Sequence, residues 1–120
     1  MGMSYRETIT QYYAAFRDRD RDRLRQLLTP DFHFVSAFGE FRDRDVMLDA
    51  IWPSVGQTWA TSLRIFGIGP EFVVLYEHEN APGVTRPPMT MAEYVRFSGD
   101  QIAEIEVFVG RPLTRDGRRD

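Results

Sequence analysis

Two histidines are the side chains of this sequence that change charge near neutral pH, and one of them is placed where it could move a proton. His78 is expected to share a strand face with Tyr76, so it could act as a general base if that face lines a cavity, or fill a structural role if it does not. His33 is expected on the strand face opposite Ser36, which favours a structural or interface role. Because the histidines are far apart and no cysteine or spaced carboxylate cluster accompanies them, the sequence predicts no metal site.

The sequence offers few side chains that could act as a nucleophile. Ser36 has no base next to it in the sequence, which favours a small space-filling side chain over an activated hydroxyl. The chain has no cysteine, so it has no disulfide, no thiol nucleophile and no thiolate metal ligand. We therefore expect any reaction to be acid–base chemistry without a cofactor.

Size and charge exclude further classes of protein. The 120 residues, 14.0 kDa, predict a single domain over residues 1–120 with one core. A net charge of -3 gives no basic surface for nucleic acid, so a hydrophobic small molecule is the more natural partner. The first residues lack the apolar run of a signal peptide, and no stretch approaches the roughly 20 apolar residues of a membrane span. We expect a cytoplasmic protein that does not enter a membrane.

A β-hairpin at residues 90–110 is the clearest structural element. Its second arm alternates between apolar and polar residues, with a one-residue slip near Ala103. Ser98, Gly99 and Asp100 suit the reversal between the arms, because these residue types tolerate positive φ or bond to their own backbone.

Three helices are predicted. The first starts at a capping box of Ser4 and Glu7 and turns an aromatic stripe inward: Tyr5, Ile9, Tyr12, Tyr13 and Phe16. The alternating Arg and Asp residues at 17–23 suit a solvated connection, and Asp20 caps a second helix that Pro30 ends. The second helix is expected to bury Leu24, Leu27 and Leu28. Asp43 caps the third helix, which is expected to bury Val46, Met47, Ala50 and Ile51.

Strands fill the rest of the chain. Residues 31–38, up to Phe38, predict a first strand with Phe32, Phe34 and Ser36 on one face. Residues 59–68 and 72–79 predict two more strands, followed by a loop at 80–88. Residues 111–120 are expected to fray. Helices followed by strands, with one helix after the first strand, are typical of an α+β fold.

This pattern resembles the SnoaL-like branch of the NTF2-like superfamily, which includes ketosteroid isomerases and polyketide cyclases. The resemblance rests on four stretches: Tyr12-Tyr13-Ala14-Ala15-Phe16, Leu27-Leu28-Thr29-Pro30-Asp31-Phe32, the turn at Gly39, and Tyr94-Val95-Arg96-Phe97 through Asp100-Gln101-Ile102-Ala103-Glu104-Ile105. It implies a cone-shaped α+β barrel. In such a barrel a curved, mixed, mostly antiparallel sheet wraps around the N-terminal helices, with a pocket between them, and the protein is commonly a dimer.

The resemblance also implies site residues. Tyr12 falls where the ketosteroid isomerases keep an oxyanion-donating tyrosine, and Glu93 falls where they keep a protonated carboxylic acid. Ser36 replaces their base aspartate and cannot move a proton alone. Tyr12, Glu93 and His78 are therefore the catalytic candidates, with a locally bonded core tyrosine as the alternative for Tyr12 and an exposed strand residue as the alternative for Glu93. The candidates for contacts with a ligand are Phe16, Phe34, Ser36, Trp52, Trp59 and Tyr76, with core packing as the alternative role for the two tryptophans.

Three functions remain open at this stage. The first is a cofactor-independent isomerase, cyclase or hydratase acting on an apolar cyclic or polyketide-like substrate. The second is a non-catalytic ligand-binding protein, and the third is a dimeric interaction module whose interior is packed core. The strand alternation and the resemblance together predict an interior formed by Phe16, Phe34, Val95, Phe97, Ile105 and Val107. The outer sheet face, with Arg96, Phe108 and His33, is the expected contact of a homodimer.

Overall fold

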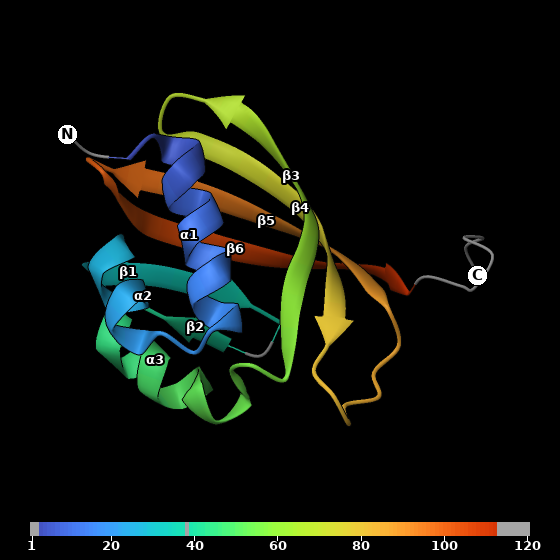
Figure 1. Cartoon of the computed structure of the whole chain (residues 1–120). Coiled ribbons are helices and arrows are strands. Elements are labelled where there is room, and N and C mark those ends of the chain that lie inside the picture. Colours follow the sequence, from blue (N-terminus) through green and yellow to red (C-terminus); the bar gives the residue numbers. More distant parts are fainter. Residues whose placement is uncertain (1–2, 38, 113–120) are drawn as a thin grey trace.

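The helices of the chain lie against one side of a curved sheet (Figure 1). The computed structural model describes residues 3–37 and 39–112, apart from the side chains of residues 111 and 112. Helix α1 spans Tyr5–Arg17, α2 spans Arg21–Leu27 and α3 spans Arg44–Ile51, followed by the short 3-10 helix η1 at Trp52–Ser54. The predicted caps are present, because the side chains of Ser4, Asp20 and Asp43 accept hydrogen bonds from the backbone amides of Glu7, Arg23 and Val46.

Over the described residues the sheet has six strands in the order β2-β1-β6-β5-β4-β3. Their bounds are Leu28–Ser36 for β1, Gly39–Phe41 for β2, Thr58–Ile68 for β3, Glu71–Asn80 for β4, Met89–Ser98 for β5 and Gln101–Pro112 for β6. Strands β1 and β6 are parallel, whereas the other neighbours are antiparallel. The sheet does not close, and α1 lies across its concave side (Figure 1). The predicted α+β fold with a mixed, mostly antiparallel sheet is confirmed.

The core lies between α1 and the concave face. Val95, Phe97 and Ile105 are buried, and Phe16, Phe34 and Val107 pack partly buried against them, so the predicted strand register is confirmed. The slip expected near Ala103 is a break in the pairing of β5 with β6. There Arg96 pairs with Glu104 but Phe97 pairs with Ile102, and both Ile102 and Ala103 are buried.

Several boundaries differ from the prediction. Leu28 is fully buried as predicted, but it opens β1 instead of ending α2, because its extended backbone already pairs with Ile102 of β6. The predicted inward position of Val46 is wrong, since its side chain is 57% exposed while α3 buries Met47 and Leu48. The predicted strand end at Phe38 and the fraying expected beyond residue 112 lie outside the described residues.

Within the part of the chain that the structure describes, no helix is both long and apolar enough to cross a membrane.

Candidate functional site

A cavity of about 510 Å³ opens between the helices and the concave face of the sheet. Side chains from α1, from α3 and the segment after it, and from all six described strands line it. Most of these side chains are apolar or aromatic, and the volume lies within the usual range for small-molecule sites. Eight of the nine sequence-predicted site residues line the cavity: Tyr12, Phe16, Phe34, Ser36, Trp59, Tyr76, His78 and Glu93.

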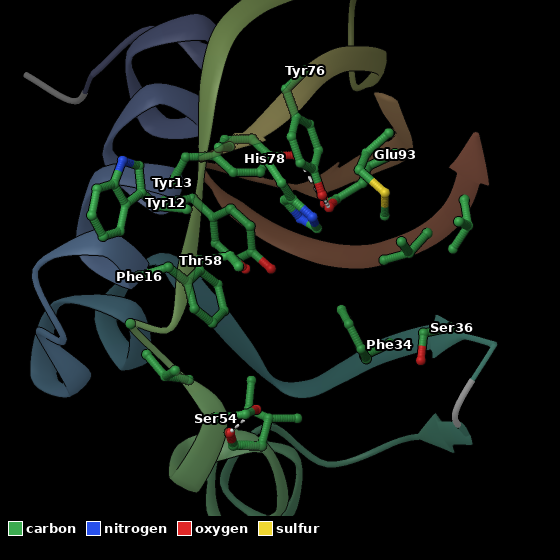
Figure 2. A pocket seen from close by; sticks show the side chains of 18 of the residues that line it. Tyr12, Tyr13, Phe16, Phe34, Ser36, Ser54, Thr58, Tyr76, His78 and Glu93 are labelled. Carbon is green, nitrogen blue, oxygen red and sulfur yellow. Dashed lines mark hydrogen bonds between the residues drawn. The ribbon is translucent and has the colours of Figure 1, made fainter. Parts of the chain in front are cut away.

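Glu93 is the buried acid of this cavity, and two tyrosines hold it (Figure 2). The Tyr13 hydroxyl donates to its Oε1 at 2.8 Å, and the Tyr76 hydroxyl donates to its Oε2. Strand alternation explains the position of Glu93, because it lies in a row with Val74 of β4 and Val107 of β6 on the concave face. A carboxyl group therefore sits among apolar neighbours with both its oxygens bonded to phenols.

Burial raises the pKa of the Glu93 carboxyl, and the hydrogen bonds from Tyr76 and Tyr13 oppose this rise without cancelling it. Burial also raises the pKa of Tyr13 and of Tyr76, and the neighbouring Glu93 adds to both shifts. The phenols therefore keep their protons, and the carboxyl keeps its own over a wider pH range than an exposed glutamate does.

A count of protons shows what this network can offer a ligand. Tyr13, Tyr76 and a neutral Glu93 carry three protons, but the bonds among them use only two. One proton is left to donate to an acceptor in the cavity. When Glu93 is ionised, the two phenolic protons both bond to the carboxylate and none remains. Donation from the network thus depends on the protonation of Glu93.

Tyr12 lies beside this network without joining it. Its ring packs edge-on against Tyr13 and Phe16, with centroids 5.1 and 4.9 Å apart. Burial, with a further contribution from Glu93, raises the pKa of Tyr12. Its hydroxyl has no hydrogen-bond partner among residues 3–37 and 39–110. The hydroxyl is also not fully enclosed by protein, and Tyr12 lines the cavity. The Tyr12 hydroxyl is therefore a second donor available to a cavity ligand.

His78 adds an imidazole to the same wall. It follows Tyr76 on the concave face of β4, their ring centroids are 5.6 Å apart, and Figure 2 shows its ring projecting into the cavity. Burial, with a smaller effect from the Arg86 charge, lowers the pKa of His78. The ring is therefore neutral at pH 7 and able to accept a proton.

The opposite wall carries smaller polar groups. Phe34 and Ser36 come from β1, Ser54 ends η1, and Thr58 is the first residue of β3 (Figure 2). The Ser54 hydroxyl donates to the Ile51 carbonyl at 2.9 Å. The polar groups of the cavity thus fall at two ends, with the larger acid–base cluster at the Glu93 end.

Trp52 is the predicted ligand contact that the structure places elsewhere, since the described cavity wall does not include it. The guanidinium groups of Arg19 and Arg21 lie over its ring, 5.3 and 5.5 Å from the ring centroid. Arg19 also donates to the Val55 carbonyl, and Val55 lines the cavity. The charged run at residues 17–23, interpreted from the sequence as a solvated connection, therefore also holds one cavity wall.

Tyr13 is the residue that sequence reasoning missed. It was included in the helical stripe, but the resemblance assigned the site tyrosine to Tyr12. Both tyrosines lie on the buried face of α1, so the stripe alone does not separate them. A buried glutamate needs hydrogen-bond donors for its carboxyl oxygens. The sequence signal for Tyr13 was therefore its place beside Tyr12, since either hydroxyl could donate to an inward-facing acid.

Among the described residues, no group of three or more histidines and carboxylates is arranged to hold a metal ion.

The open, mixed sheet curves around a helix and leaves an apolar cavity between them, an α+β fold that this chain shares with NTF2-like proteins of known structure. The model of the SnoaL-like domain family matches residues 9–105, so the chain belongs to this family. No curated protein is similar enough in sequence to count as a match.

Three solved structures illustrate the fold. An NTF2-like protein of unknown function from Burkholderia pseudomallei has a TM-score of 0.77 and 19% identity, over 89% of this chain and 92% of that one. A putative polyketide cyclase from Sinorhizobium meliloti has a TM-score of 0.73 and 17% identity, over 88% and 100%. A putative ketosteroid isomerase from Kribbella flavida has a TM-score of 0.77 and 13% identity, over 92% and 80%. At these identities the likeness concerns the fold.

Proposed function

We propose that this chain binds an apolar small molecule with a carbonyl oxygen and moves a proton on the carbon next to that carbonyl. The observation that carries the proposal is the Tyr13–Glu93–Tyr76 network in the wall of a largely apolar cavity. A buried carboxyl with a raised pKa is typical of sites that stabilise charge on an oxygen.

The oxygen of the ligand would accept two hydrogen bonds. One comes from the Tyr12 hydroxyl and the other from the third proton of the Glu93 network. Both donors are buried and already positioned, so they stabilise negative charge on that oxygen more strongly than water does.

His78 would act as the base. Its neutral ring takes a proton from the carbon beside the carbonyl, and the electron pair of that C–H bond forms a carbon–carbon double bond while the carbonyl electrons move onto the oxygen. The resulting enolate regains a proton on another carbon in an isomerisation, or attacks an internal carbonyl in a cyclisation. This assignment needs no base at Ser36, where the ketosteroid isomerases keep an aspartate.

Exchange of hydrogen for deuterium tests the reaction without knowledge of the natural substrate. The acetyl protons of 4-acetylbiphenyl should exchange with D2O faster in the presence of the protein, as followed by NMR. His78→Asn should reduce this acceleration by about 10²-fold or more, because it removes the base. His33→Asn on the outer face is the matched control and should leave the rate unchanged.

The binding of 4-acetylbiphenyl, measured by calorimetry, separates the alternatives. Binding with accelerated exchange supports the enzyme. Binding without exchange would reject the catalytic part and leave a ligand-binding protein. If no apolar ketone binds, both are rejected in favour of an interaction module.

We also propose that a second copy of the chain covers the outer face of the sheet. Phe66, Val73 and Phe108 are 51%, 42% and 51% exposed there. Acidic Glu106 lies on β6 in the middle of the sheet and Arg64 lies on the edge strand β3, so a two-fold axis between them would bring opposite charges together.

His33 and Arg96 would contribute less to this contact than the sequence suggested. Arg96 and His33 both pair with Glu104 of the same chain, at 2.9 and 3.2 Å. Light scattering of the wild type should give a particle of about twice 14.0 kDa. Phe108→Glu should give the single-chain mass with unchanged helical content, and a wild type of single-chain mass would end this proposal.

A further inference from the structure

We propose that the ligand is an acid, and that Arg86 binds its anionic group at the rim of the cavity while the carbonyl lies at the Glu93 network. This inference rests on the proposed function and names the class of ligand: an elongated apolar molecule with a carbonyl at one end and a carboxylate at the other.

Arg86 is fixed beside the cavity rim by the loop that joins β4 to β5. Its guanidinium donates to the Gln57 side chain at 2.7 Å, and Gln57 lies between two cavity-lining residues, Gly56 and Thr58. The Asn80 side chain donates to the Arg86 carbonyl at 3.1 Å, and the Ala81 amide donates to the Gln57 carbonyl at 2.9 Å. These bonds hold an exposed cation next to the rim.

The concave face of β4 leads from the acid–base cluster to this cation. Val74 and Tyr76 are buried, whereas His78 and Asn80 are half-buried, so the strand rises out of the core toward the loop. Tyr76 and Asn80 are four residues apart, about 13 Å of extended chain. The Arg86 guanidinium is near enough to His78 for its charge to act on that ring, so a ligand two or three rings long can reach from the Glu93 network to the guanidinium.

The charges favour an anion at this position. Arg86 forms no ion pair with a carboxylate in the described part of the chain, and its bonded side-chain partner, Gln57, is neutral. Its charge acts on His78 inside the cavity strongly enough to contribute to the lowered pKa of that ring. Glu77 and Glu79 alternate with His78 and face the other side of the sheet. While Glu93 holds its proton, the described cavity wall carries no negative charge to repel a carboxylate.

Two probes of the same shape test the inference. They are 4'-acetylbiphenyl-4-carboxylate and its methyl ester, which share the ketone and differ in the charge at the far end. Calorimetry should show the acid binding about 5- to 20-fold more tightly than the ester, since a charged hydrogen bond at a partly exposed site has this strength. The difference should shrink as salt is added.

Variants of Arg86 test whether this residue causes the preference for the acid over the ester. Arg86→Gln keeps a donor for Gln57 and removes the charge, so it should abolish the preference for the acid and leave ester binding unchanged. Arg86→Lys should retain most of the preference. Arg23→Gln is the matched control, because Arg23 on α2 also donates to a glutamine side chain, that of Gln11 at 3.3 Å, and lies outside the cavity wall; it should behave as the wild type.

The outcomes separate this inference from the proposed function. If wild type binds acid and ester equally, or if Arg86→Gln weakens both equally, Arg86 does not recognise an anion, and the proposed function still stands. If neither probe nor 4-acetylbiphenyl binds the wild type, the proposed function fails and this inference fails with it. A salt-dependent preference in the wild type supports the inference even if an Arg86 variant does not fold.

Discussion

Replacing Tyr13 with phenylalanine should change the pH at which the cavity stops binding a ketone. The hydroxyl of Tyr13 donates to Glu93 Oε1 at 2.8 Å, and this bond lowers the pKa of the carboxyl against the larger effect of burial. A hydrogen bond to a charged group contributes about 1.5 to 3 kcal/mol, and one pKa unit corresponds to about 1.4 kcal/mol. Without the bond, the pKa of Glu93 should rise by about one to two units.

The consequence for binding follows from the proton count. Neutral Glu93 leaves one proton for the ketone and ionised Glu93 leaves none, so affinity falls as the pH rises through the pKa of Glu93. In Tyr13→Phe, neutral Glu93 and Tyr76 still carry two protons, and the hydrogen bond between them uses only one. Affinity at low pH should therefore be preserved, while the midpoint of its loss moves to higher pH.

Tyr12→Phe is the matched control, because it removes the neighbouring hydroxyl that is not bonded to Glu93. It should weaken ketone binding at every pH by up to about tenfold and leave the midpoint in place. The assay is calorimetric titration with 4-acetylbiphenyl from about pH 4 to pH 9, a range that covers ordinary and strongly raised carboxyl pKa values. The reasoning is refuted if the Tyr12 variant moves the midpoint and the Tyr13 variant does not.

Stability offers further tests. Because the pKa of Glu93 is raised in the folded state, the protein should lose unfolding free energy as the pH rises from about 4.3, the unfolded value, through the folded pKa, and Glu93→Gln should lack this loss in urea titrations. The lowered pKa of His78 has the opposite sign, so stability should fall as the pH drops below about 6.5, and His78→Asn should remove that slope. Gly67→Ala should cost more than about 2 kcal/mol, because φ is 134° and the new Cβ would lie under 3.0 Å from the Glu71 carbonyl oxygen. Gly99→Ala, with φ of 62° and open space around it, should cost only about 1 kcal/mol, and equal costs by thermal denaturation would contradict this reasoning.

The sequence by itself determined which strand residues share the concave face of the sheet. Alternation along β5 places Glu93 on the same face as Val95 and Phe97, and alternation along β4 places His78 with Tyr76. These positions depend on local geometry, because a residue two places along a strand returns to the same face whatever the rest of the chain does. For the same reason the caps of Ser4, Asp20 and Asp43 could be read from a few residues.

Tertiary structure decided which of these side chains meet. Tyr12 and Tyr13 are neighbours on the buried face of α1, and only the angle and depth at which the helix docks on the sheet select the hydroxyl that reaches Glu93, 80 residues away. Trp52 shows the same limit, because its ring is held by Arg19 and Arg21 of the charged run and not by the cavity. Spacing along one element fixes a face, but contact between two elements depends on packing that involves the whole core.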